Sequence, residues 1–150
     1  MIQQNMGNIY AKVGIESTVS SASPHKLVLL LFEKAIETIE KAKVQISRGN
    51  TIEKAKAISK VIAIIGGLQE GLNMEAGGEI AENLKRLYDY ICPCLVEANL
   101  KNDVVSLNEI SRLIQELTEG WKAIEGHATL SLQNLQVSAL AGGKLSYGKC

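Results

Sequence analysis

The chain has 150 residues, and its 16 basic and 16 acidic side chains give a formal net charge of zero, so nothing in its charge favours nucleic acid or an anionic membrane as partner. Apolar residues make up 46% of the sequence, aromatic residues only 4%, and there are two prolines. This composition is typical of one all-α domain that is long enough to bury a core.

The first 17 residues are mostly polar and predict an N-terminal arm rather than part of the core. They carry no basic stretch followed by an apolar one, so they do not resemble a signal peptide. Glycines weaken the helical pattern, which therefore should form a helix only when docked. Its apolar side chains recur at helical spacing: Ile2, Met6, Ile9, Tyr10 and Val13.

The first confident helix is predicted from Pro24 to about Arg48. Ser23 is a good N-cap, proline at the first helical position loses no hydrogen bond, and Gly49 is a natural residue to end the helix. From residue 27 to residue 32, six apolar residues follow one another without a break. A helix that packs on one core needs only an apolar stripe, so this run predicts apolar surface that something else must cover.

The second helix is predicted over residues 50–72, where Asn50 and Glu53 have the spacing of a capping box. Its apolar residues recur at steps of three and four. Gly66 and Gly67 lie inside this helix, although each glycine costs roughly 1 kcal/mol relative to alanine there. Two interpretations remain open: another helix packs closely against them, or they line a groove for a partner.

The third helix is predicted from about Gly78 to residue 98, and the fourth from the cap Asp103 to residue 124. Pro93 removes one backbone hydrogen bond, so we expect a kink in the third helix. Trp121 continues the apolar stripe of the fourth helix and is interpreted as a core residue.

The connections between the four helices are only two to six residues long, which predicts antiparallel neighbours and therefore an up-down four-helix bundle. We accordingly divide the chain into an N-terminal arm (1–17), a bundle (18–125) and a mostly irregular tail (126–150). The longest uncharged stretch of the tail contains Thr, Ser, Gln and Asn, so we expect no membrane insertion.

Catalytic and metal-binding patterns are weak. His25 and His127 are not part of a Glu-x-x-His pair, which excludes the di-iron chemistry known from some bundles. Cys92, Cys94 and Cys150 are an odd number and offer no second ligand pair, so we expect inert thiols rather than a disulfide framework or a metal site. We predict a protein that is not an enzyme and has no cofactor and no metal.

The apolar surface beyond the four stripes then needs a function. A groove that receives the amphipathic helix of a partner explains it economically. The alternative is a structural bundle that associates with itself through this surface, without a client. The sequence leaves the oligomeric state open between a monomer and a weak dimer.

Several stretches resemble the flagellar secretion chaperones of the FliS family: "ASPHKLVLLLFEKAI", "GGEIAENLKRLYDYI" and "EANLKNDVVSLNEI" with the later Trp121. The N-terminal "IYAKVGIES" and the terminal "SYGK" also fit. The resemblance implies an antiparallel four-helix bundle of the bacterial cytosol that binds the disordered C-terminal region of flagellin. It further implies that the protein prevents premature polymerisation and delivers flagellin to the gate of the flagellar type III export apparatus.

The expected contact residues for flagellin are apolar positions that the core stripes do not need, together with one aromatic residue of the N-terminal arm at the rim of the groove. They are Tyr10, Val28, Leu31, Ile64, Gly67 and Leu68.

Overall fold

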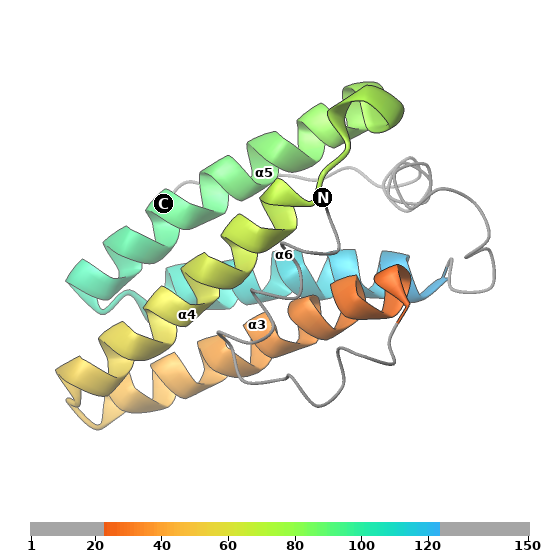
Figure 1. Ribbon diagram of the computed structural model, residues 1–150. Coiled ribbons are helices and arrows are strands. Elements are labelled where there is room, and N and C mark those ends of the chain that lie inside the picture. The colour runs from red at the N-terminus through yellow and green to blue at the C-terminus, as the bar shows by residue number, and fades with distance from the viewer. Residues whose placement is uncertain (1–22, 124–150) are drawn as a thin grey trace.

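The computed structural model describes residues 23–123, which form four helices joined by short turns (Figure 1). Each helix packs against the next one in the sequence, and the first also packs against the last, so the four surround a common core. This confirms the predicted all-α bundle, whereas the arm with Tyr10 and the tail lie outside the described residues. The helices are α3 (Pro24–Ser47), α4 (Thr51–Glu70), α5 (Met74–Lys101) and α6 (Val104–Ala123).

The predicted N-caps are present and explain where three of the helices begin. In each case a side-chain oxygen accepts a hydrogen bond from a backbone N–H in the first turn, which otherwise has no partner inside the helix. The three bonds are Ser23 Oγ with Lys26 N at 3.2 Å, Asn50 Oδ1 with Glu53 N at 3.3 Å, and Asp103 Oδ1 with Ser106 N at 3.1 Å.

The ends of α3 and α5 are set by residues with positive φ. Gly49 has φ 68°, and the backbone N–H of Asn50 reaches back to the carbonyl of Gln45 at 2.9 Å, as expected for a Schellman motif. Asn102 takes the same left-handed conformation, with φ 53°, after α5. These two tight endings allow α4 and α6 to start immediately and run back along the bundle.

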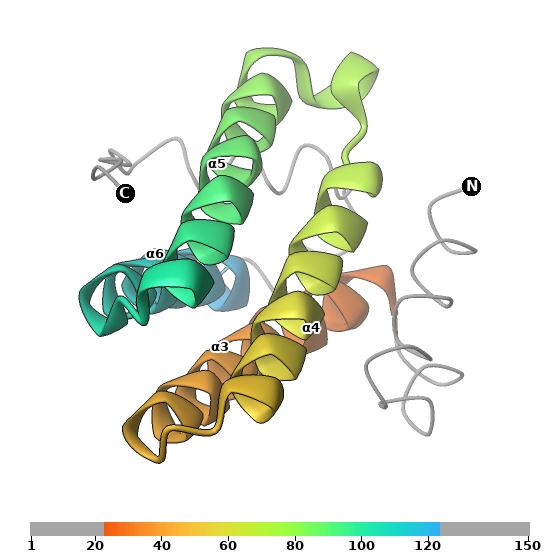
Figure 2. The same cartoon turned by 90° about the vertical axis from the view of Figure 1, so that its left-hand side faces the viewer.

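The break in α5 lies at Gly78 and not at Pro93. Gly78 has φ 53° and ψ −131°, so the first turn of α5 is set at an angle to the rest, as Figure 2 shows between α4 and α5. Helical backbone continues through Pro93 to Lys101. Because Pro93 and Asp89 are both exposed, water can bond the carbonyl that proline leaves without a donor. The helix is therefore not interrupted at Pro93, and the kink expected at this residue stays a prediction.

Two glycines should respond to alanine with opposite signs. A Cβ at Gly66 or at Gly78 would meet no atom within 4 Å, so backbone conformation alone decides the outcome. We expect Gly78→Ala to lower the free energy of unfolding by about 1–3 kcal/mol, because its φ and ψ suit only glycine. Gly66→Ala should raise it by about 0.5–1 kcal/mol, because α4 has ordinary helical backbone there. Urea denaturation measures both, and changes of the same sign would contradict this account.

The open space beside Gly66 bears on the expectation that another helix packs closely against the glycine pair of α4. No neighbouring helix approaches this glycine closely, so close packing is not the reason for it. Gly67, the next residue, is buried.

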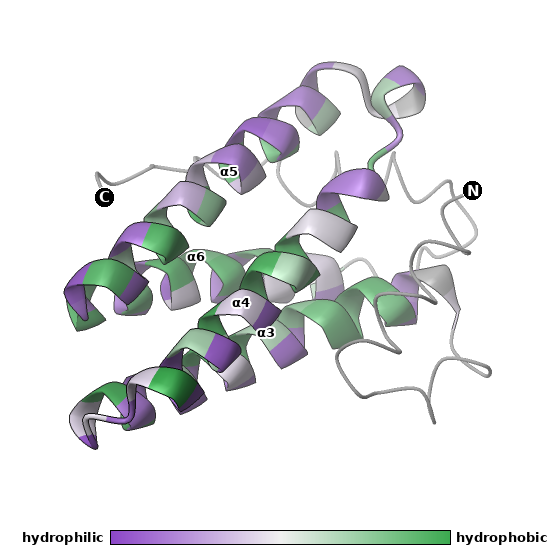
Figure 3. Cartoon of the chain, turned by 60° about the vertical axis from the view of Figure 1, so that its left-hand side comes forward, coloured by the Kyte–Doolittle hydropathy of each residue, from purple (hydrophilic) through white to green (hydrophobic). Residues whose placement is uncertain are grey.

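The apolar run of α3 is covered within the protein. Figure 3 shows hydrophobic positions on consecutive turns of this helix, and α3 packs against both α4 and α6. A helix between two neighbours buries more than a single stripe, so the expected surplus of apolar surface is not there. The buried residues of the run are Leu27, Val28, Leu29, Leu31 and Phe32.

Among residues 23–123, no helix combines the length and the apolar character that crossing a membrane requires.

Candidate functional site

The described residues among those expected to bind a partner lie on α3 and α4 and belong to the core of the bundle. Leu31 and Ile64 are fully buried, Leu68 is 3% exposed and Val28 is 6% exposed. All four belong to one continuous apolar cluster, and Gly67 is buried beside them. They are not surplus to the core, as the sequence suggested, because α3 contacts two helices at once. Tyr10 lies outside the described residues.

A reciprocal contact joins the first turn of α3 to the last turn of α6. The indole N–H of Trp121 donates to the carbonyl of His25 at 2.8 Å, and Nε2 of His25 lies 3.0 Å from the carbonyl of Trp121. The two rings stack with centroids 4.8 Å apart and planes only 9° from parallel. Phe32 adds an edge contact to the indole. Sequence reasoning placed Trp121 in the core correctly but did not find its partner, 96 residues away.

At the opposite end of the bundle, a buried lysine joins α4 to α5. Lys54 is 6% exposed, and its ammonium group donates to the carbonyl of Asn99 at 2.8 Å and to Oδ1 of Asn102 at 2.7 Å. The C-terminal end of α5 carries a partial negative charge, which favours a cation there. The sequence did contain a signal, because Lys54 lies four residues before the core residue Ile58 and so on the same helix face.

Tyr88 is a second polar group inside the core. Its side chain is fully buried, its hydroxyl has no hydrogen-bond partner among the described residues, and burial raises the pKa of the phenol. A buried hydroxyl without a partner is uncommon, and it lowers stability relative to an apolar group of the same shape.

The cysteines differ from each other. Cys92 is a free, partly buried thiol whose pKa is raised by burial and by the nearby charge of Asp89. Cys94 is almost completely buried and is disulfide-bonded, so the expectation of three inert thiols is wrong for this residue. Among residues 23–123, no three His, Cys, Asp or Glu side chains come together as metal ligands would.

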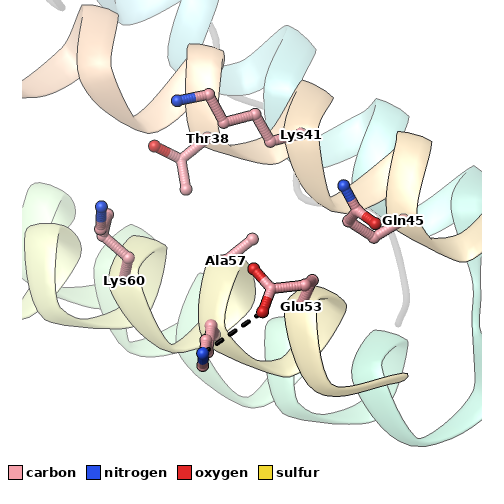
Figure 4. Close-up of a pocket in the computed structure, with 7 residues that line it drawn as sticks. Thr38, Lys41, Gln45, Glu53, Ala57 and Lys60 are labelled. Atoms are coloured by element: carbon pink, nitrogen blue, oxygen red, sulfur yellow. Dashed lines mark hydrogen bonds and ion pairs between the residues drawn. The ribbon is translucent and has the colours of Figure 1, made fainter. Parts of the chain in front are cut away.

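Two of the open cavities on the surface lie between helices that the structure describes. One, of about 200 Å³, lies between α3 and α6. The larger one, of about 320 Å³, lies between α3 and α4 near the turn that joins them (Figure 4), and we call it the lysine groove. Its lining comes from one face of each helix: Thr38, Lys41 and Gln45 of α3, and Glu53, Lys56, Ala57 and Lys60 of α4.

Exposed apolar side chains gather at one end of the bundle. Ile52 lies in the first turn of α4, Leu100 in the last turn of α5 and Val105 in the first turn of α6. These three turns share the end of the bundle at which Lys54 contacts α5. The sequence analysis did not single out any of them.

Comparisons with known proteins point to one family over most of the chain. The family described as "Flagellar protein FliS" matches residues 6–128. The flagellar secretion chaperone FliS of Salmonella typhimurium is 44% identical over 121 residues, which cover 80% of this chain and 90% of the relative. The flagellar secretion chaperone FliSB of Pseudomonas aeruginosa is 46% identical, with 77% and 91% covered, and FliS of Vibrio cholerae is 39% identical, with 77% and 85% covered. This chain therefore belongs to the FliS family of flagellar secretion chaperones.

Proposed function

We propose that the client of this chaperone is flagellin and that the bound part is its disordered C-terminal region. The observation that carries the proposal is the family match, which extends over residues 6–128 and so includes all four helices of the bundle. Bound flagellin is kept from polymerising and is delivered to the gate of the flagellar type III export apparatus, which is the second partner. Both encounters take place in the bacterial cytosol.

The apolar cluster between α3 and α4 is our candidate surface for the client. Val28 and Leu68 lie at its edge, while Leu31 and Ile64 lie at its centre, next to Gly67. Because these side chains are buried in the free protein, a client that uses them must bind a conformation in which they are accessible. The apparent affinity is then lowered by the population of that conformation. Tyr10 of the N-terminal arm remains part of the proposed contact.

No chemistry has to accompany this function. A chaperone that covers an amphipathic segment acts by binding alone, because the segment cannot associate with other subunits while its apolar face is buried. Release then has to come from the export apparatus and not from a reaction on this chain.

A synthetic peptide of the flagellin C-terminal segment tests the proposal. We expect it to bind, to gain helix, and to show a negative change in heat capacity, because apolar surface leaves water on binding. Isothermal calorimetry at several temperatures and circular dichroism measure both effects. Absence of binding, or binding without a heat-capacity change, would argue against flagellin as the client.

Alanine variants locate the contact. Val28→Ala and Leu68→Ala should weaken peptide binding, whereas Ile58→Ala should lower stability by a similar amount without changing affinity. Ile58 is a suitable control because it is equally buried on α4 and belongs to the same core cluster but is not one of the proposed contact residues. Equal losses of affinity in all three variants would place the client elsewhere.

The alternative is a structural bundle that associates with itself and has no client. The exposed side chains of Ile52, Leu100 and Val105 are the observation that favours it. Sedimentation at micromolar concentration separates the two functions, since the alternative requires tight self-association without peptide.

A further inference from the structure

The lysine groove is polar, and it is separate from the apolar cluster proposed for flagellin. It lies between the C-terminal half of α3 and the N-terminal half of α4, whereas the cluster involves the other halves of both helices. Ala57 has a small side chain between the longer ones, which leaves space between the two helices. Figure 4 shows Lys60 rising from α4 toward α3, whereas the side chain of Lys41 runs along α3 at the border of this space.

The charge in the groove is unbalanced. Three lysines and one glutamate line it, so its local charge is positive although the whole chain is neutral. Lys56 is paired with Glu53 at 3.3 Å, and Lys41 is paired with Glu37, outside the lining, at 3.2 Å. Both pairs are exposed and lie within one helix, so they are weak and exchange partners easily. Lys60 forms no ion pair with another of the residues 23–123.

We propose that the lysine groove docks an acidic, extended segment of a partner protein, with carboxylate side chains between Lys41 and Lys60. The uncompensated charge supplies the attraction, and the amide of Gln45 offers a further polar contact on the α3 side of the groove. This surface acts in addition to the flagellin contact and does not depend on it.

The dimensions of the groove suit a short segment. Its lining residues span eight positions on each helix, from 38 to 45 and from 53 to 60, and the seven steps between the first and the last correspond to roughly 10 Å of helix. An extended chain covers that length with about three residues. A motif with two acidic side chains separated by one residue therefore fits.

The occupant is another protein and not an end of this chain. Residues 1–22 contain one acidic side chain, Glu16, and residues 124–150 contain one, Glu125. Neither segment has two acidic residues close together, and the C-terminal segment carries Lys144 and Lys149 in addition. A segment of that charge has no complementarity to the lysine groove.

An octapeptide of alternating glutamate and serine, blocked at both ends, tests the docking. In NMR titrations of the full chain at low salt, we expect saturable amide shifts centred on Thr38 and Ala57 that disappear at high salt, because exposed charges are screened there. The same peptide with glutamine in place of glutamate should cause no such shifts. Shifts of equal size with the glutamine peptide would overturn the proposal.

Variants that change the charge of the lysine groove test whether its positive charge attracts the peptide. The double variant Lys41→Gln, Lys60→Gln should bind about fivefold more weakly, while Glu53→Gln should bind about threefold more tightly because it frees Lys56. Lys85→Gln is the control, since Lys85 is an exposed lysine that pairs with an acidic residue of its own helix, as Lys41 does. An equal loss in the control would show diffuse attraction, and inorganic phosphate that binds as tightly as the peptide would show a simple anion site. Either result overturns docking of an acidic segment.

Discussion

Replacing Trp121 with alanine is expected to lower the free energy of unfolding by about 3–5 kcal/mol, the largest effect of any single substitution considered for this chain. The indole is 2% exposed and fills the space between α3 and α6. Its removal leaves a cavity and also removes the hydrogen bond from the indole N–H to the carbonyl of His25, which joins the two helices. Urea denaturation followed by circular dichroism measures the change without relying on the lost fluorophore.

The variant Trp121→Phe separates the ring from its hydrogen bond. Phenylalanine fills most of the space and packs against Phe32 but cannot donate to His25, so we expect a loss of about 1–3 kcal/mol. The difference between the two variants then reports the packing contribution. If alanine and phenylalanine cost the same, the hydrogen bond and not the packed ring holds α3 to α6.

The second large effect is expected at Lys54. Lys54→Ala should lower the free energy of unfolding by about 2–3 kcal/mol, because hydrogen bonds from a buried ammonium group to two acceptors at the end of α5 are lost together. The neighbouring Lys56→Ala is the control. Lys56 is exposed and forms a single pair with Glu53 on its own helix, so its replacement should change stability by about 0.5 kcal/mol or less.

A methionine at the same position keeps the length of the apolar stem of Lys54 but removes the ammonium group, with its charge and its two hydrogen bonds. Lys54→Met should therefore recover part of the loss seen with alanine, because the stem still packs while the two acceptors lose their donor. Chemical denaturation of Lys54→Ala, Lys54→Met and Lys56→Ala measures the free energy of unfolding of each variant. A cost for Lys54→Ala no greater than for Lys56→Ala would show that the contact with α5 contributes nothing measurable.

The features that were predictable from the sequence are those with a local cause. Ser23, Asn50 and Asp103 each bond a backbone N–H three residues ahead, so a short stretch of sequence contains both partners. The end of α3 at Gly49 and the apolar stripes of the later helices also depend only on residues that are close in the sequence. From these signals the four helices and their antiparallel order follow.

What was not predictable depends on neighbours that are distant in the sequence. The sequence shows that α3 is apolar on all sides from residue 27 to residue 32, but only the fold shows that both α4 and α6 pack against this helix. The same is true of the contact between His25 and Trp121. The groove between Lys41 and Lys60 also needs two helices, since neither lysine is unusual on its own helix.

The candidate site shows why the sequence alone does not tell whether an apolar residue is exposed or buried. Val28 and Leu68 were chosen because they were thought to be exposed, and they are instead part of the core. A surplus of apolar residues in one helix has two explanations, a binding surface or a second packing neighbour. The count of such residues does not distinguish between them.

The hydrogen bonds between His25 and Trp121 have one more consequence, for the order of the helices along the chain. They bring the start of α3 and the end of α6 to the same place, so each of the four helices has a sequence-adjacent or hydrogen-bonded neighbour at both of its ends. The architecture is thus cyclic in space although the polypeptide is linear. Circular permutants that join residue 123 to residue 23 by a short linker, with new termini at the Gly49 turn, preserve every contact between the helices. The position at which the chain begins is therefore not a requirement of the bundle.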